Sequence, residues 1–227
     1  MGVSEDVTEN CHVKSDFLSF VPVYAGKIKK VLKGELKMSR FFALLYRMKY
    51  ILRWALMRNT QPENLAEHSY YTATLAHALA VIRRDVFHGS ADPERVAVCA
   101  LYHDTSEILT GDLPTPIKYY NPEIREAYQS IERTASRKLV ERLPAELKLE
   151  FSQVMGEQSE EIRVLVKAAD KLSAYLKCLE EKGAGNPEFA RAEEQTLKAL
   201  QAMHLPEVDY FLEQFVPAFS LTLDDLD

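Results

Sequence analysis

From residue 38 onward, apolar residues recur every three or four positions, which is the spacing of an amphipathic helix. The first such stripe consists of Phe41, Phe42, Leu44, Leu45, Met48 and Leu52. Further stripes predict helices over 64–84, from 92 to beyond 107, and over 122–143, 159–182 and 187–215, the last interrupted at Pro206. The alternating pattern of a strand does not occur over any length. We therefore predict an all-α fold built as one helical bundle.

Local signals mark where helices start and stop. Asn64 with Glu67 three residues later has the form of a capping box. Asp92-Pro93 supplies an N-cap and a first helical residue for the next helix. The segment 110–118 contains two prolines and a glycine, so we predict that it interrupts the helical pattern.

Residues 1–37 differ from the rest of the chain. They begin polar and acidic and then become rich in lysine, without a sustained helical stripe. We interpret them as a poorly ordered arm, or as an artefact of a start assigned upstream of Met38. A basic arm that binds a partner is the alternative. The predicted domain covers residues 38–227.

Composition narrows the class of protein. The chain has 227 residues, a formal net charge of -6 and 47% hydrophobic residues, an ordinary globular composition. An acidic chain without a basic cluster is a poor partner for nucleic acid. No apolar run approaches the length that spans a membrane, and no signal peptide is evident. The three cysteines, Cys11, Cys99 and Cys178, form no metal-binding or disulfide pattern, which fits the cytoplasm.

Three polar residues interrupt the predicted buried helix that follows Asp92. His103, Asp104 and Glu107 share one helical face with Ala100, beside the core. Buried charges need partners, and a divalent cation would satisfy all three side chains together. The alternative is a His-Asp hydrogen-bonded pair that helps to close the core.

Two more residues suggest a metal site when they are taken together with this pair. His68 lies on the apolar side of its helix, and Asp170 borders the apolar stripe of another. Alone, each has an ordinary role, as a hydrogen-bonded core histidine and a solvated aspartate. Two imidazoles and two carboxylates suit an open site for one ion such as Mn2+, Co2+, Fe2+ or Mg2+.

The order His68, His103-Asp104, Asp170 resembles the signature of HD-domain metal-dependent phosphohydrolases. Four longer segments resemble the bacterial HD-domain 5′-deoxynucleotidases, which hydrolyse deoxyribonucleoside 5′-monophosphates. These segments are Arg53-Trp-Ala-Leu-Met-Arg-Asn59, Glu63-Asn-Leu-Ala-Glu-His-Ser69, Tyr102-His-Asp-Thr-Ser-Glu-Ile-Leu-Thr-Gly-Asp-Leu-Pro-Thr-Pro-Ile-Lys118 and Ala169-Asp-Lys-Leu-Ser-Ala-Tyr-Leu-Lys-Cys-Leu-Glu180. The resemblance extends from about residue 38 to the C-terminus and implies an HD-domain helical bundle.

The resemblance also implies roles for individual residues. Glu107 matches the carboxylate that handles a proton near the phosphate, and Arg53 matches the residue that orients the phosphate. Trp54 matches the aromatic beside the sugar, where it would exclude a 2′-hydroxyl, and Asp112 matches a partner of the 3′-hydroxyl. The implied ligands of one divalent ion, Co2+, Mn2+ or similar, are His68, His103, Asp104 and Asp170. The implied substrate contacts are Arg53, Trp54, His68, Asp104, Asp112, Leu113, Pro114, Thr115 and Asp170. A homodimer is implied too, and the C-terminal aromatics Tyr210, Phe211, Phe215 and Phe219 allow one.

The same residues allow simpler roles and different functions. Arg53 beside Trp54 also fits an arginine that extends along a core indole, and Glu107 could simply orient a metal ligand. An HD hydrolase of triphosphates or of another phosphate ester, and a non-catalytic helical interaction module, are alternative functions. A two-metal enzyme would need histidines between His103 and Asp170, and there are none.

Overall fold

The computed structural model describes residues 25–26, 28–30, 38–118, 120–156 and 158–226. The chain divides into two units, Met1–Ser39 and Arg40–Asp227, and the helices from α2 onward lie in the second unit. The predicted arm over 1–37 falls almost entirely outside the described residues. The described part of the chain contains helices and no strand, only an isolated bridge between Leu52 and Asn64, so the predicted all-α fold is confirmed.

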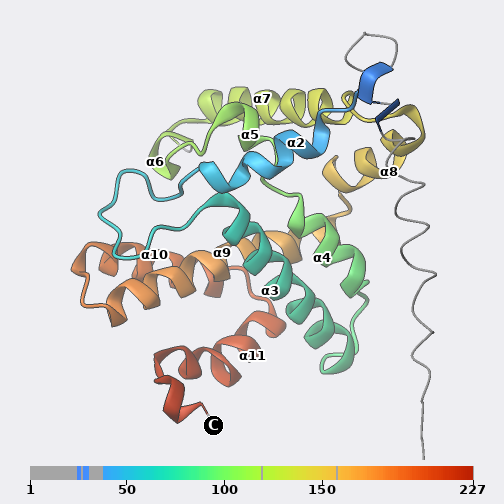
Figure 1. The fold of residues 1–227 in the computed structure, drawn as a ribbon. Helices are drawn as coiled ribbons and strands as arrows, with labels where there is room; N and C mark the ends of the chain where they lie inside the picture. Colours follow the sequence, from blue (N-terminus) through green and yellow to red (C-terminus); the bar gives the residue numbers. More distant parts are fainter. Residues whose placement is uncertain (1–24, 27, 31–37, 119, 157, 227) are drawn as a thin grey trace, which may run out of the picture. The chain divides into compact units, whose positions relative to one another are not determined.

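A bundle of long helices forms the centre of the molecule. Helices α3 (Leu65–Asp85), α4 (Pro93–Leu101) and α9 (Glu160–Gly183) pack against one another, and α10 (Ala190–Gln201) and α11 (Pro206–Gln214) cover them (Figure 1). Their shared core is aliphatic and fully buried at Leu79, Val96, Leu165, Leu172 and Leu200. None of the described helices is long and apolar enough to cross a membrane.

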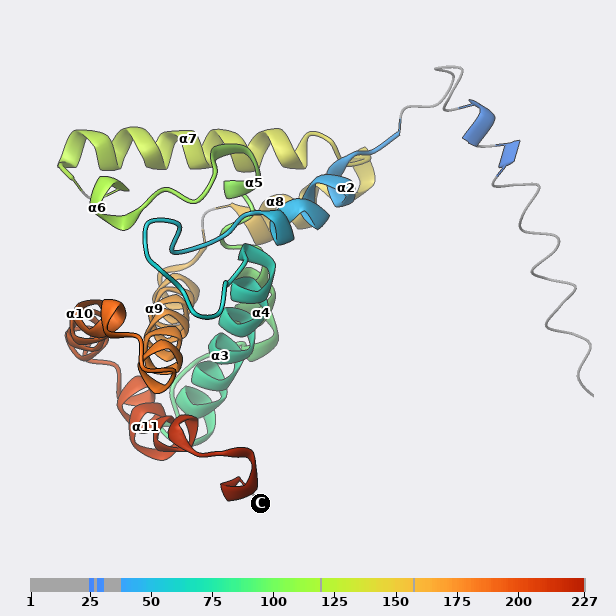
Figure 2. The same ribbon diagram turned by 60° about the vertical axis from the view of Figure 1, so that its left-hand side comes forward.

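A second group of elements lies across one end of this bundle (Figure 2). Its members are α2 (Phe41–Leu45), η1 (Tyr46–Tyr50), α5 (Glu107–Thr110), α6 (Thr115–Lys118), α7 (Pro122–Val140) and α8 (Ala145–Met155). Phe41, Leu139 and Leu143 form its buried core. Three short helices, η2 (Pro187–Phe189), η3 (Val216–Ser220) and η4 (Leu223–Asp225), complete the described fold.

The predicted helix starts are confirmed. The Asn64 side chain accepts hydrogen bonds from the backbone N–H groups of Ala66 and Glu67, and the Glu67 carboxylate accepts from Asn64 N–H, which is a complete capping box. Asp92 caps α4 with Pro93 as its first residue. Because α3 starts at Leu65, the first turn of this well-capped helix contains His68.

The expected helix from 92 to beyond 107 ends early, at Leu101. The His103 ring and the Thr105 hydroxyl bond the carbonyls of Ala100 and Tyr102, at 2.6 and 2.8 Å. These side chains compete with backbone N–H groups for the carbonyls that would accept hydrogen bonds if the helix continued. His103 and Asp104 therefore lie in a turn between α4 and α5, and the prediction that they share one helical face with Glu107 is wrong.

Other boundaries differ from the prediction in smaller ways. The first stripe becomes a five-residue α-helix followed by a 3-10 helix, and Phe42 and Leu52 are exposed. The segment 110–118 includes the one-turn helix α6, because its two prolines fall beside or within a first turn, where proline is tolerated. Helix α7 stops at Val140 rather than at 143. Helix α8 was not predicted.

Candidate active site

One face of α9 carries an unusual row of polar residues. Asp170, Ser173, Lys177 and Glu181 are spaced three or four residues apart, so they line one side of the helix. Ser173, Lys177 and Glu181 are buried, while the Asp170 side chain is 39% exposed. Each of the four contacts either His68 or the loop before α3.

The loop before α3 is held near its middle and at its ends. Near its middle, Glu181 accepts hydrogen bonds from the N–H groups of Thr60 and Gln61, and Lys177 donates to the Gln61 carbonyl at 2.6 Å. At its ends, Arg53 N–H donates to the Glu63 carbonyl at 3.0 Å beside the Leu52–Asn64 bridge. The loop that carries Arg53 and Trp54 is thus fixed against α9 and α3.

His103 is held in one tautomer by its own turn. Its Nδ1 lies 2.6 Å from the Ala100 carbonyl oxygen, which can only accept, so Nδ1 carries the hydrogen. In the neutral ring Nε2 then presents a lone pair. Nε2 is buried and has no hydrogen-bond partner among the described residues, although Asp104 Oδ2 lies 3.0 Å away outside hydrogen-bond geometry.

His68 faces the same point from the first turn of α3, fully buried. Its Nδ1 lies 3.3 Å from Ser173 Oγ and 3.7 Å from Glu63 Oε1. Its Nε2 lies 3.2 Å from Asp170 Oδ1 and 3.6 Å from Asp104 Oδ2. Hydrogen bonding on the Nδ1 side is the usual means of orienting a histidine ligand.

These side chains fit a divalent ion. The ligand atoms of His68, His103 and Asp170 all lie within 4.8 Å of one another. Asp104 is outside that set of three but contacts both rings through Oδ2. Imidazole nitrogens and carboxylate oxygens are ligands of borderline and hard divalent ions. The buried, unpartnered Nε2 of His103 supports the fit, since such an atom costs free energy until a partner binds.

The charges at this point agree with such a fit. Burial raises the pKa of Asp104, but the neighbouring His103 and His68 outweigh burial and hold it well below its usual range. Burial also raises the pKa of Asp170, but the hydrogen bond from His68 outweighs burial and lowers this pKa to about 2. Burial lowers the pKa of His103, yet the Asp104 carboxylate raises it to about 9, so the ion-free ring is protonated at neutral pH and a bound ion would displace the Nε2 proton. Two carboxylates are therefore ionised and attract a positive charge.

Arg53 and Trp54 lie next to this group and share a carboxylate. Glu63 Oε2 accepts hydrogen bonds from Trp54 Nε1 at 2.9 Å and from Arg53 Nε at 3.3 Å. Arg53 Nη1 lies 3.5 Å from Asp104 Oδ2. Burial lowers the pKa of Arg53, but Asp170, Asp104 and Glu63 together raise it, so the guanidinium stays charged.

Glu107 is also buried. Its Oε2 has no hydrogen-bond partner among the described residues, and its Oε1 is 3.9 Å from Lys118 Nζ. Lys118 is itself bound to Glu132 at 2.8 Å. Burial and the charges of Asp104 and Asp112 raise the pKa of Glu107 to about 9. A carboxyl group with a raised pKa can hold and release a proton near neutral pH.

The predicted nucleotide loop follows α5. Gly111 turns the chain with a φ of 75°, which favours glycine. Asp112, Leu113 and Pro114 are half-buried, and Thr115 is the first residue of α6. Burial raises the pKa of Asp112, while the positive charge of Arg53 lowers it, so this loop and Arg53 share one electrostatic environment.

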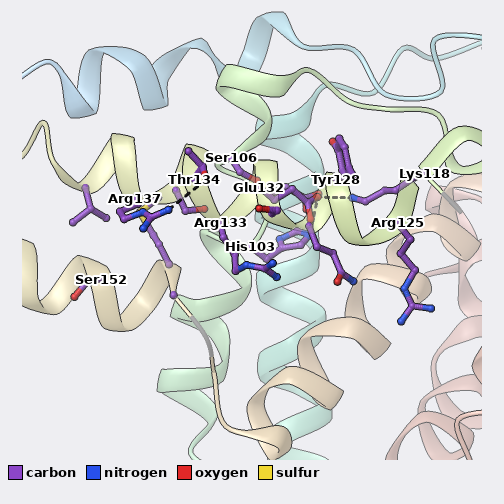
Figure 3. A pocket seen from close by; sticks show the side chains of 17 residues that line it. His103, Ser106, Lys118, Arg125, Tyr128, Glu132, Arg133, Thr134, Arg137 and Ser152 are labelled. Carbon is purple, nitrogen blue, oxygen red and sulfur yellow. Dashed lines mark hydrogen bonds and ion pairs between the residues drawn. The ribbon is translucent and has the colours of Figure 1, made fainter. Parts of the chain in front are cut away.

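Two cavities border His103. The larger, of about 740 Å³, is lined by His103, Asp104, Lys118 and residues of α7 and α8 (Figure 3). The smaller, of about 260 Å³, includes Asp170 in its wall. Arg125, Arg133 and Arg137 of α7 are among the residues that line the larger one. Its volume suits a nucleotide-sized ligand. Arg53, Trp54 and Asp112 are not among the described residues that line either cavity.

Residues 40–219 match the family described as 5'-deoxynucleotidase YfbR-like. A 5'-deoxynucleotidase of Yersinia pestis is 53% identical over 191 residues, which covers 83% of this chain and 97% of the relative. A 5'-deoxynucleotidase of Yersinia pseudotuberculosis matches equally well. The chain belongs to the YfbR-like 5′-deoxynucleotidase family. The resemblance noted in the sequence is confirmed, and the protein is a phosphohydrolase of deoxynucleoside 5′-monophosphates.

Solved structures of HD-domain phosphohydrolases share the fold of this 5′-deoxynucleotidase. One from Listeria innocua has a TM-score of 0.69 at 24% identity and covers 79% of this chain and 88% of its own. The cyanophage S-2L HD phosphohydrolase DatZ, solved with dA and one catalytic Zn2+ ion, has a TM-score of 0.61 at 23% identity. It covers 82% of this chain and 100% of its own. The predicted HD-domain bundle is confirmed.

Several residues around the candidate site were not predicted from the sequence. Glu63 and Lys118 stand out in the sequence only as members of longer motifs, without a role of their own. Ser173, Lys177 and Glu181 were not predicted, although their spacing from Asp170 places them on one helical face. A row of polar residues on an otherwise apolar face was the signal that could have found them.

Proposed function

We propose that this 5′-deoxynucleotidase hydrolyses its substrate at one divalent ion held by His68, His103, Asp104 and Asp170. The observation that carries the proposal is the buried Nε2 of His103, which lacks a hydrogen-bond partner in the described chain and faces the same point as His68 Nε2. Co2+, Mn2+ or a similar ion suits this mixed nitrogen and oxygen donor set. When bound, the ion would polarise a phosphoryl oxygen and lower the pKa of a water molecule.

The phosphate is the part of the substrate that Arg53 would hold. Its Nε is bonded to Glu63, which leaves the terminal nitrogens of the fork to face the Asp104 side of the site. A planar guanidinium gives two parallel hydrogen bonds to phosphate oxygens. Arg53 would therefore orient the phosphate and neutralise charge that develops on it.

The proton is handled by Glu107 in this proposal. Its raised pKa, caused first by burial, keeps it protonated at neutral pH. A protonated carboxyl can donate to the 5′-oxygen as the nucleoside leaves, which lowers the barrier to departure. Lys118, at 3.9 Å, would limit how far Glu107 moves.

The nucleoside would lie between Trp54 and the loop after α5. The Trp54 indole stands beside the sugar, where a 2′-hydroxyl would meet the ring, and Asp112 receives the 3′-hydroxyl. Leu113, Pro114 and Thr115 continue this wall. The opposing effects of burial and of Arg53 on the pKa of Asp112 support the placement of this loop near the phosphate side of the site.

Phosphate release tests the proposal directly. The chelated protein would be assayed with ribo- and deoxynucleoside mono-, di- and triphosphates, each with Mn2+, Co2+ and Mg2+. The expected result is phosphate from deoxynucleoside monophosphates only after an ion is added. Undiminished turnover in the chelated protein, or faster hydrolysis of triphosphates, would contradict it.

We also propose a cytoplasmic homodimer. Tyr46, Tyr50, Tyr70 and Tyr71 are each more than half exposed near the start of α3, an area that a second copy could cover. Of the C-terminal aromatics named above, Phe211 is buried in the bundle core, whereas Phe215 and Phe219 are exposed. Sedimentation velocity at micromolar concentration and fractionation of the native cells test the two statements, and a monomer or a secreted chain would contradict them.

A further inference from the structure

Glu63 is the point at which three side chains of the site meet. Oε2 accepts hydrogen bonds from Trp54 Nε1 and Arg53 Nε, and Oε1 lies 3.7 Å from His68 Nδ1. The Glu63 side chain is only 11% exposed. Burial raises its pKa, but the bonds and charges of His68 and Arg53 outweigh burial and lower it, so Glu63 is a buried carboxylate.

The backbone brings Glu63 to this place. Arg53 N–H donates to the Glu63 carbonyl, and Leu65 N–H donates to the Ile51 carbonyl, at 3.0 and 2.9 Å. These bonds flank the Leu52–Asn64 bridge and hold the two segments side by side. Since Asn64 is the N-cap of α3, the position of Glu63 is set by a rigid helix start rather than by a free loop.

Trp54 is held in a position that it would not adopt without support. Its φ is 58°, in the left-handed region that a bulky side chain rarely occupies. The ring packs against Phe189, with centroids 5.3 Å apart. Its single polar atom, Nε1, donates to Glu63 Oε2 at 2.9 Å. Packing on one face and one charge-assisted bond at the edge together fix the plane of the ring.

We propose that Glu63 is the positioning residue that makes Trp54 selective for deoxyribose. This inference rests on the proposed role of Trp54. Without the bond from Nε1, the indole can turn about its side-chain torsions away from the sugar, and space for a 2′-hydroxyl opens. Glu63 Oε2 also accepts a hydrogen bond from Arg53 Nε. The Trp54 indole beside the sugar and the Arg53 guanidinium on the phosphate therefore keep a fixed distance from each other.

Kinetics of four variants test the inference, with kcat/KM measured for dAMP and AMP. Glu63→Ala should lower the dAMP-to-AMP ratio about tenfold, the order expected for one hydrogen bond to a charged group. Glu63→Gln keeps an acceptor for the indole and should stay within about twofold of the parent ratio. Trp54→Phe removes the N–H and should lower the ratio, and Glu63→Ala should then add little in that background.

A matched control comes from a neighbouring ion pair. Glu188 binds Arg58 Nε at 2.6 Å, and its carboxylate accepts from the side chain and backbone of Arg58 rather than from Trp54. Unlike Arg53, which is 14% exposed, the Arg58 side chain is 92% exposed. Glu188→Ala should leave the ratio unchanged. Trp54 is also the single tryptophan of the chain, so its fluorescence reports this one ring. Glu63→Ala should shift the emission to longer wavelength and increase quenching by acrylamide, and Glu188→Ala should do neither.

The outcomes separate the inference from the proposed function. If the parent protein hydrolyses dAMP and Trp54→Ala lowers the ratio, an unchanged ratio in Glu63→Ala overturns the inference alone. If Glu63→Ala does not fold, the Trp54→Phe variant tests the inference instead. An unchanged dAMP-to-AMP ratio in Trp54→Phe would overturn the inference. A parent protein without deoxynucleotidase turnover would contradict the proposed function itself.

Discussion

Glu181 accepts hydrogen bonds from both the N–H and the hydroxyl of Thr60, at 2.9 and 2.8 Å, across 121 residues of sequence. Lys177 lies 2.7 Å from the other carboxylate oxygen. Together with Lys177, this fully buried carboxylate joins the loop of Arg53 and Trp54 to α9. Removal of one partner from a buried, hydrogen-bonded ion pair leaves the others without compensation.

Glu181→Ala is therefore expected to lower the free energy of unfolding by about 3–5 kcal/mol, as for other broken buried pairs. The measurement is urea denaturation followed by circular dichroism. Glu180→Ala is the control, because Glu180 also contacts Lys177 but its side chain is 56% exposed. Glu180→Ala should lower the free energy of unfolding by less than about 1 kcal/mol. Equal costs for the two variants would contradict the role given to Glu181.

His103→Ala and Asp170→Ala are expected to lose the divalent ion while keeping most of their helix. Each removes one of the atoms that lie within 4.8 Å of one another. Metal content after dialysis, measured by plasma mass spectrometry beside far-ultraviolet circular dichroism, checks this. His77→Ala, an exposed histidine of α3, should bind like the parent. Undiminished metal in both site variants would refute the ligand set.

Glu107→Ala should keep the ion and lose turnover. Glu107 is not one of the proposed ligands, and general acid catalysis contributes on the order of 10²–10⁴ in rate. Metal content and kcat for dAMP, measured on the same preparation, distinguish this from simple loss of the site. A kcat near that of the parent protein would remove Glu107 from the mechanism.

The stability of the chelated protein should fall as pH rises from about 5 to 9, in part because of Glu107. Its pKa is raised from 4.5 to about 9 by burial, so in this range the unfolded chain releases a proton that the folded chain keeps. The free energy of unfolding then decreases by up to about 1.4 kcal/mol per pH unit from this group. Glu107→Gln should remove that contribution, with a gain at pH 8 and none at pH 4.5. Parallel profiles for parent and variant would show the prediction to be wrong.

Asn64→Ala is expected to destabilise the chain by about 1 kcal/mol, the usual cost of a lost N-cap. The Asn64 side chain satisfies two N–H groups in the turn that positions His68. Asn64→Asp keeps an acceptor at the positive end of the helix and should be close to the parent. Thermal melts of the three proteins give the comparison, and a loss in Asn64→Asp as large as in Asn64→Ala would exclude capping as the cause.

The sequence predicted the elements whose cause is local. Asn64 with Glu67, and Asp92 with Pro93, show the start of a helix in the residues themselves, and the structure has both starts. Helix α8 was not predicted because two of its apolar residues, Leu147 and Leu149, are exposed, so its apolar residues do not all fall on one stripe at helical spacing. Its existence depends on packing of Phe151 beside Phe41, which no local pattern reveals.

The site was predictable only where its chemistry is visible in residue type. His68, His103, Asp104 and Asp170 are noticeable because charged and imidazole groups interrupt apolar stripes. Glu63 is not, since an acidic residue in a polar loop is ordinary until its contacts are known. The turn at His103 was also hidden, because it follows from hydrogen bonds of the side chains to Ala100 and Tyr102.

The polar row of α9 also constrains how the gene can vary. Asp170 and Glu181 are eleven positions apart, about three full turns of helix, so both face the same side. Insertion or deletion of one codon between them would rotate one end by about 100° relative to the other. Either Asp170, the proposed metal ligand, or Glu181, which holds the Arg53 loop, would then point into the wrong surroundings. A substitution at an exposed position of this stretch leaves that register unchanged, whereas a change in its length does not.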